Sequence, residues 1–293
     1  MAAANRSSLS AATQGKGSTK PANISDYDSV KEPSRLIYSK NRKLHDIKSL
    51  TIKVNDDPDG AVPGFLHIPA SRPSKPDFAA ILLSGAGGGV VGPSSIYMSI
   101  AEKLSSLDTG IPVMRLDYRY PARNKYCTRD VLAAMDYIES NYSISKFVLV
   151  GWSFGGAPVF AVGGMDSRVI ACATVASQTA ETEGIRNLAP RPVLLLHGKA
   201  DRTLSPSCSR NLYELYGPRG DRRIHIFDGD DHSLTRHAAK AEEMLCDFIA
   251  EVGGLKISET DQEDVVRKEL VDDGERVELM KKGGDLRGEE RVE

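Results

Sequence analysis

Short apolar runs alternate with segments of helical periodicity between residues 44 and 252. Runs rich in apolar and β-branched residues occur at 78–83, 112–116, 147–150, 169–176, 193–196 and 223–227. Several are apolar at every position, which is typical of strands buried on both faces of a sheet. Apolar residues recur with helical spacing between them, at 96–106, 128–140, 155–163, 206–216 and 235–251. The alternation predicts an α/β fold, a mostly parallel sheet with helices on both faces.

Two further strands are predicted ahead of this series. Residues 48–54 and 61–68 have strand character, and the sequence Asp-Asp-Pro-Asp-Gly at 56–60 separates them. Such residues favour a tight turn, so we expect a β-hairpin here. With it the predicted sheet has eight strands.

The two ends of the chain differ from this body. Residues 1–43 show neither pattern clearly, and we expect a disordered or loosely attached N-terminal arm. Residues 254–293 contain 13 acidic and 8 basic side chains and few apolar ones, a composition typical of disorder. The prediction is therefore one α/β domain at 44–252, followed by a charged, disordered C-terminal tail at 253–293.

Composition excludes several classes of function. The 38 basic and 40 acidic side chains give a net charge of -2, which argues against a chain-wide grip on nucleic acid or an anionic membrane. No apolar run approaches the ~18 residues of a membrane helix. The four cysteines, which form no CxxC pair, are Cys127, Cys172, Cys208 and Cys246. Their spacing argues against a disulfide scaffold or a zinc ribbon and favours a reducing compartment, for which we predict the cytoplasm. Residues 1–25 lack acidic side chains, so an organelle transit peptide is the alternative.

The strongest chemical signal is a Gly-x-Ser-x-Gly motif. An apolar strand runs into Gly151-Trp152-Ser153-Phe154-Gly155, and a helical segment of small residues follows. A serine on such a sharp strand-to-helix turn leaves no room for side chains two residues before or after it, which explains Gly151 and Gly155. The motif predicts Ser153 as a nucleophile raised above the sheet.

A serine nucleophile needs a base, and the base needs an orienting acid. The strand at 193–196 leads into a loop that contains Asp201, and the strand at 223–227 leads into a loop that contains His232. Carboxyl ends of parallel strands share one edge of a sheet, so we expect both loops beside Ser153. Asp201 would orient His232, and His232 would be the general base and then the general acid.

Other acids and histidines were weighed against these two. Asp228, Asp230 and Asp231 are close to His232 in sequence, but we expect neighbours in a tight turn to point apart and to be solvated. His197 ends a strand before a glycine, where a structural histidine is expected. His237 near the Gly-Asp-Asp-His run suggests a metal, but no third ligand is evident. We predict no metal.

A glycine-rich loop, Ser84-Gly85-Ala86-Gly87-Gly88-Gly89, follows the strand at 78–83. We expect the backbone N–H groups of Ala86 and Phe154 to form an oxyanion hole. Gly87, Gly89 and Gly92, with Asp117 after the next strand, also match a dinucleotide-binding pattern. Pro93 directly follows Gly92, where that pattern needs a running helix, so we predict no cofactor.

The glycine-rich loop, the serine elbow and the late aspartate and histidine loops resemble, in this order, the α/β-hydrolase superfamily, in particular its lidless dienelactone-hydrolase-like and small serine-esterase members. The resemblance implies that Ser153, Asp201 and His232 form a catalytic triad. The chain departs from the pattern at Leu204 and Ser205, and at Ser84, where many members have histidine. Dienelactone hydrolases proper use a cysteine nucleophile, so lactone specificity is not implied.

Only 47 residues separate Ser153 from Asp201, which leaves no chain for a lid domain. An uncovered site suits small or accessible acyl groups. The sequence therefore predicts a carboxylesterase-like serine hydrolase that cleaves a small-molecule ester or thioester through an acyl-serine intermediate. The alternatives are a non-catalytic binding or scaffold protein of this fold and a serine peptidase. The sequence predicts no oligomeric state.

Overall fold

The computed structural model describes residues 23–39, 42–43, 45–56, 60–70 and 76–287. Its centre is an eight-stranded sheet in the order β10-β9-β8-β7-β5-β6-β4-β3. The strands are β3 (His45–Val54), β4 (Gly60–Pro69), β5 (Phe78–Leu83), β6 (Val113–Leu116), β7 (Lys146–Trp152), β8 (Val169–Val175), β9 (Val193–Gly198) and β10 (Arg222–Phe227). β4 pairs antiparallel with both β3 and β6, and all other pairs are parallel. The predicted eight-stranded, mostly parallel sheet is confirmed.

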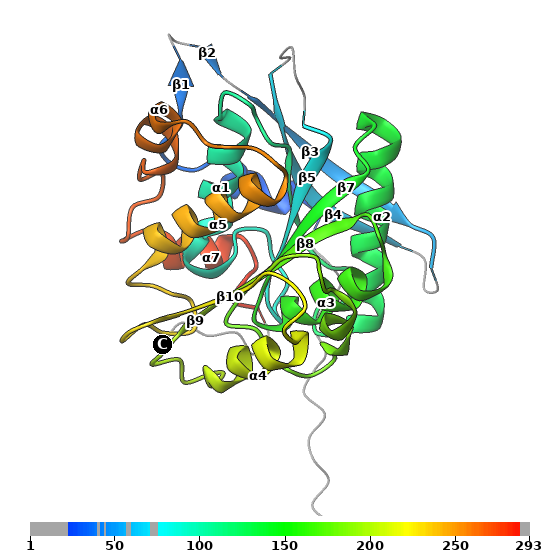
Figure 1. Ribbon diagram of the computed structural model, residues 1–293. Helices are drawn as coiled ribbons and strands as arrows, with labels where there is room; N and C mark the ends of the chain where they lie inside the picture. Colours follow the sequence, from blue (N-terminus) through cyan, green and yellow to red (C-terminus); the bar gives the residue numbers. More distant parts are fainter. Residues whose placement is uncertain (1–22, 40–41, 44, 57–59, 71–75, 288–293) are drawn as a thin grey trace, which may run out of the picture.

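Helices cover both faces of the sheet (Figure 1). One face carries α1 (Ile96–Ser106) and α5 (Ala238–Val252), and the other carries α2 (Asn124–Tyr142), α3 (Gly156–Met165) and α4 (Ser207–Tyr216). β5 shows why: Phe78, Ala80 and Leu82 belong to one core cluster, while the residues between them belong to the other. Successive side chains of a strand point to opposite faces, so an all-apolar strand builds two cores at once.

The hairpin and the interval after Ser153 also match the sequence predictions. β3 and β4 pair from His45 with Pro69 to Val54 with Gly60; the turn residues 57–59 lie outside the described part of the chain. Residues 153–201, all described, form 3-10 turn η3 (Ser153–Gly155), α3, β8, 3-10 turn η4 (Glu183–Asn187) and β9. This interval contains no lid domain.

The C-terminal segment, residues 253–287, differs from the predicted disordered tail. It forms α6 (Glu259–Asp261), a π-helical turn η5 (Gln262–Val266) and α7 (Arg276–Lys282). Several of its apolar side chains are buried in the core cluster that also contains side chains of α1 and α5: Val265, Val266, Leu270 and Met280. The composition led us to expect solvated charges in this segment, but Arg276 forms an ion pair with Glu242 of α5 at 3.4 Å. The tail prediction is wrong for these residues because packing partners, not composition, decide their burial; residues 288–293 lie outside the description.

The N-terminal arm is likewise packed where it is described. 3-10 turn η1 (Ile24–Val30) contacts α7 and β3 and buries Tyr27 and Val30 in the core. Arg115 of β6 donates from Nη1 to the Val30 carbonyl at 3.0 Å. Residues 31–39 continue to a short strand, β1 (Tyr38–Ser39), which pairs with β2 (Arg42–Lys43). The expectation of a loose arm is wrong for this part. Residues 1–22, most of the stretch at 1–25 for which a transit peptide was the alternative, lie outside the description.

Candidate active site

Ser153 lies at the carboxyl end of β7, at the point where the strand turns into helix. Its φ of 53° is in the left-handed region, which only a tightly constrained turn imposes on a serine. A Cβ on Gly151 would lie 2.3 Å from the Gly155 carbonyl oxygen. One on Gly155 would lie 2.6 Å from the carbonyl oxygen of Ser84. The two glycines are therefore required for the steric reason expected from the motif.

The loops after β9 and β10 bring Asp201 and His232 together. Asp201 Oδ2 lies 2.7 Å from His232 Nδ1, and both side chains are fully buried. Gly198, at the end of β9, allows the two loops to approach, because a Cβ there would lie 2.2 Å from the Asp231 carbonyl oxygen. The predicted acid and histidine are thus in direct contact.

Asp201 is held ionised by its surroundings. Its Oδ1 accepts the backbone N–H groups of Thr203 and Leu204 at 2.8 and 2.7 Å. Its Oδ2 also lies 3.0 Å from Nε2 of His197. Burial alone would raise the pKa of Asp201, but hydrogen bonds from the two imidazoles and the Leu204 amide outweigh it and lower the pKa to about 2. The carboxylate is therefore charged over the whole physiological range.

His232 is connected to the elbow through Trp152. The indole N–H of Trp152 donates to the His232 carbonyl at 3.1 Å, and the two rings are 5.5 Å apart between centroids. Trp152 directly precedes Ser153 in the chain. The contact fixes the histidine loop beside the serine turn, so the three predicted triad residues come from adjacent loops at one edge of the sheet.

Two residues close to Asp201 and His232 compare differently with the expectations from sequence: His197 agrees with them and Asp230 does not. His197 is buried, with Nδ1 2.7 Å from Ser209 Oγ and Nε2 2.9 Å from the Leu204 carbonyl, in agreement with the structural role expected. Asp230 was expected to be solvated but is fully buried. Its carboxylate accepts the N–H groups of Arg236 and His237 at 3.0 and 3.1 Å, just before α5 begins. It shapes the histidine loop, and nothing local in the sequence distinguishes it from its exposed neighbour Asp228.

The glycine-rich loop, residues 84–92, lies beside the elbow. Within this fully described loop, Ala86 is the only residue that is not buried. Phe154 is 5% exposed and its ring packs edge-on against Tyr118. Ala86 is therefore the one partly exposed residue of this loop, and the role of its N–H as an oxyanion donor stays a prediction.

The dinucleotide interpretation of this loop does not fit the structure. A Cβ on Gly87 would lie 2.2 Å from the backbone oxygen of Arg287, so the chain itself fills the space that a pyrophosphate would need. Asp117 Oδ1 accepts the Gly89 N–H at 2.7 Å, and Oδ2 lies 2.9 Å from Arg287 Nη2. The aspartate is thus engaged within the protein.

A cluster of His45, His67 and Glu102 has ligand atoms within 4.8 Å of one another. It lies on β3, β4 and α1, away from the loops that contain Asp201 and His232. Arg115 Nε donates to His67 Nε2 at 3.1 Å, so the neutral imidazole carries its proton on Nδ1, the atom that would face a metal. His45 Nε2 lies 2.8 Å from Glu102, an ion-pair distance. We interpret the cluster as a network of buried polar side chains that contact one another and Arg115.

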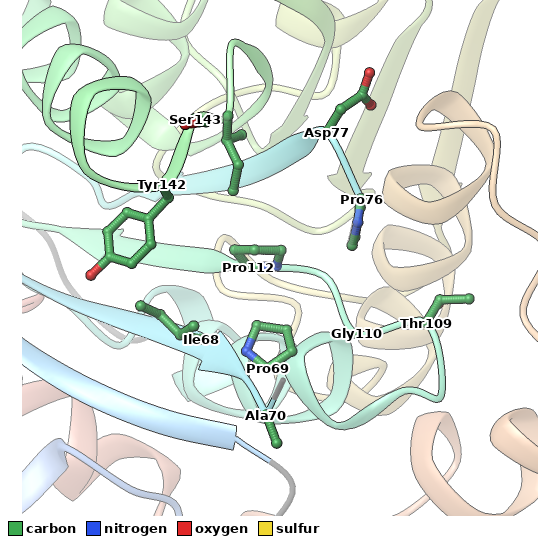
Figure 2. Close-up of a pocket in the computed structure, with 11 residues that line it drawn as sticks. Ile68, Pro69, Ala70, Pro76, Asp77, Thr109, Gly110, Pro112, Tyr142 and Ser143 are labelled. Carbon is green, nitrogen blue, oxygen red and sulfur yellow. The ribbon is translucent and has the colours of Figure 1, made fainter. Parts of the chain in front are cut away.

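A pocket of about 200 Å³ lies at the opposite edge of the sheet from Ser153. It is bounded by the end of β4, the segments that precede β5 and β6, and the end of α2; Figure 2 shows lining side chains that include Ile68, Pro69, Pro112 and Tyr142. It contains none of the predicted catalytic groups. The candidate active site is at the carboxyl edge of the sheet.

Comparison with known proteins agrees with this architecture. A family model described as "alpha/beta hydrolase fold" matches residues 81–212. The esterase domain of a Rhodothermus marinus protein superposes with a TM-score of 0.56 at 20% identity, covering 69% of this chain and 97% of that one. The protein has the α/β-hydrolase fold. The resemblance to this superfamily, predicted from the motifs, is confirmed.

Other α/β-hydrolase structures are similarly distant. A dienelactone hydrolase from Anabaena variabilis has a TM-score of 0.55 at 17% identity, over 68% of this chain and 95% of its own. A serine hydrolase without lid from Xanthomonas campestris has a TM-score of 0.52 at 15% identity, over 79% and 96%. At these identities the likeness establishes the fold alone.

Among curated proteins, the uncharacterized protein YfhR of Escherichia coli is 32% identical over 135 residues. The match covers 38% of this chain and 47% of that protein, so the chain spans about half the length of the curated relatives it matches. Within the described residues, no helix is long and apolar enough to cross a membrane.

Proposed function

We propose that the protein is a serine hydrolase that cleaves a carboxylic ester or thioester through an acyl-serine intermediate. The observation that carries the proposal is the 2.7 Å contact between Asp201 and His232 beside the strained Ser153 turn. An ionised acid on Nδ1 keeps the imidazole in the tautomer whose Nε2 can accept a proton. The esterase and dienelactone hydrolase neighbours of the same fold support the choice of an ester substrate.

In the proposed reaction, His232 Nε2 takes the proton of Ser153 as Oγ attacks the carbonyl carbon. The carbonyl oxygen becomes an oxyanion, stabilised by the backbone N–H groups of Ala86 and Phe154. When the C–O or C–S bond breaks, His232 returns the proton to the leaving alcohol or thiol. Water then attacks the acyl-serine by the same route and releases the acid.

The fold suggests which substrates fit. No lid domain is inserted between Ser153 and Asp201, and the loop tip at Ala86 is accessible. A long acyl chain needs a covered apolar trench, so small or accessible acyl groups are the proposed substrates. The cytoplasmic location expected from the cysteines stays a prediction.

The test combines a fluorophosphonate probe with a series of p-nitrophenyl esters of increasing chain length. We expect the probe to label Ser153, with loss of fluoride, and hydrolysis to be fastest for the short chains. Ser153→Ala should abolish both, while Ser140→Ala, an exposed serine on α2, should change neither. Retained turnover in Ser153→Ala would refute the assignment. Absence of labelling at pH 6–9 would favour a binding or scaffold protein, and faster cleavage of amides than of esters a peptidase.

A further inference from the structure

The end of the C-terminal segment lies directly on the glycine-rich loop. The Val90 N–H donates to the Gly283 carbonyl at 3.1 Å. A Cβ on Gly89 would lie 2.6 Å from the backbone nitrogen of Asp285, and one on Gly283 would lie 2.6 Å from the Val91 side chain. Glycines on both sides of this contact allow two backbones to touch, so the contact is built into both segments.

Asp285 is the centre of this contact. Its carboxylate, fully buried, accepts the N–H of Gly92 at 2.7 Å on Oδ1 and the N–H of Val91 at 3.1 Å on Oδ2. The hydroxyl of Ser84 also donates to Oδ1. One side chain therefore holds the first residue of the loop and its last two residues.

A second buried carboxylate holds the middle of the loop. Asp117 Oδ1 accepts the N–H of Gly89 at 2.7 Å. Its Oδ2 accepts the hydroxyl of Tyr27 at 2.5 Å and a guanidinium N–H of Arg287 at 2.9 Å. The loop is thus fixed from the C-terminal segment on one side and from the end of β6 on the other, and Tyr27 of the N-terminal arm and Arg287 join the same network.

The fixed loop is also in contact with the nucleophile turn. The hydroxyl of Tyr118 donates to the carbonyl oxygen of Ser84 at 3.0 Å. A Cβ on Gly155 would lie 2.6 Å from the same oxygen. Phe154, the residue of the second proposed oxyanion amide, packs its ring against Tyr118. A shift of Ser84 would therefore alter the spacing between the Ala86 and Phe154 amides.

We propose that Asp285 is a positioning residue for the oxyanion hole, which it sets by tying the two ends of loop 84–92 to the C-terminal segment. The inference rests on the proposed function, since an oxyanion hole matters only if Ser153 forms a tetrahedral adduct. It assigns a role to the serine at position 84, where the superfamily often has histidine. Ser84 anchors the loop to a side chain 201 residues away.

Preorganised amides stabilise the transition state more than the bound substrate. Loss of one oxyanion donor costs about 10²–10³ in kcat, so loosening the loop that carries one should cost somewhat less. We expect Asp285→Ala to lower kcat about 10–100-fold and to change KM less than threefold. The affinity for a trifluoromethyl ketone, which forms a tetrahedral adduct with serine, should fall by the same factor as kcat.

Milder variants make the test independent of folding. Ser84→Ala removes one of the three hydrogen bonds to Asp285 and should lower kcat by less than Asp285→Ala does. Asp285→Asn keeps an oxygen for Gly92 and Ser84 but turns an amide N–H2 toward Val91, and should be intermediate. Glu278→Gln, on the exposed face of α7, is the matched control in the same segment and should behave as wild type.

The outcomes separate the two proposals. If folded variants keep kcat and ketone affinity within twofold of wild type while Tm falls, the segment only stabilises the fold and the positioning role is wrong. The proposed function would survive that result. If the wild-type protein neither hydrolyses esters nor labels at Ser153, both proposals are overturned.

Discussion

Met280 tests whether the C-terminal segment is part of the folded core. Its side chain on α7 is fully buried in the cluster that α1 and α5 form on the sheet. Met165, at the end of α3, is 66% exposed. Substitution of each methionine by alanine therefore makes the same chemical change in two environments, one in the segment whose packing the sequence did not predict.

The expected magnitude follows from burial. Methionine to alanine in a core costs about 2–5 kcal/mol, because transfer energy is lost and a cavity remains. Whole domains are stable by about 5–15 kcal/mol. In a domain larger than 150 residues each kcal/mol lowers Tm by about 2–4 °C. We therefore expect Met280→Ala to unfold about 4–20 °C below wild type, and Met165→Ala within about 2 °C, as is usual for surface changes.

The assay is thermal unfolding followed by circular dichroism, with all three proteins at one pH and one concentration. The two variants must also give a single transition, so that Tm values are comparable. If Met280→Ala melts with wild type, α7 is not held against the core, and the disordered tail expected from composition is the better description. A lowered Tm for Met165→Ala of the same size would show that the comparison does not report burial.

Three further outcomes follow from the site. Gly155→Ala should lower kcat at least 100-fold, because its Cβ would meet two backbone carbonyl oxygens at 2.6 and 2.7 Å; Gly274→Ala, whose Cβ meets only a side-chain oxygen at 3.3 Å, should retain activity in the same ester assay. Asp201→Asn should lower kcat/KM by about 10³–10⁴ without loss of the circular dichroism spectrum, because an amide cannot both accept the backbone N–H groups and hold His232 in its tautomer; activity within tenfold of wild type would contradict the triad. Burial raises the pKa of Asp285 to about 7. Between about pH 4 and 7 the folded protein therefore keeps a proton that the unfolded chain releases, and stability falls as pH rises through that range. The Tm of wild type relative to that of Asp285→Asn should drop from pH 5 to pH 8.5, and a constant difference in Tm would contradict this.

The pH prediction depends on every charged group that faces Asp285. Asp117 raises the pKa of the Asp285 carboxyl further, after burial. Arg115 of β6 and Arg287 interact with it as positive charges, and Tyr97 of α1 and Tyr27 of η1 face it as well. The two arginines favour the ionised form of the Asp285 carboxyl. They offset the effect of burial only in part, because the net shift of the pKa of Asp285 is upward.

The sheet, the turn at Ser153 and the contact between Asp201 and His232 could be predicted because their requirements are local in sequence. A strand buried on both faces must be apolar at successive positions, as in β5. A serine elbow needs Gly151 and Gly155 at fixed spacing, and the close contacts at both positions show why. Asp201 and His232 each follow a strand of the parallel part of the sheet, so the order of strands was sufficient to bring their loops together.

The C-terminal segment was misjudged because composition averages over side chains that have different environments. Met280 and Arg276 are buried only four residues apart, among exposed charges. Arg276 donates to the Ser94 carbonyl at 2.8 Å and pairs with Glu242 of α5. Neither partner is close in sequence, so no window of neighbouring residues contains the information that decides burial.

Ser84 and the acidic tail were noted separately in the sequence, the first as a departure from the family pattern and the second as a charged appendage. The structure joins them, because the Ser84 hydroxyl donates to Asp285. Here a carboxylate from the C-terminal segment approaches the short serine side chain. A buried carboxylate is costly unless several donors surround it, and Gly92 and Val91 supply two backbone N–H groups. The unusual residue in the loop and the packed tail are thus two halves of one contact, and each makes chemical sense only in the presence of the other.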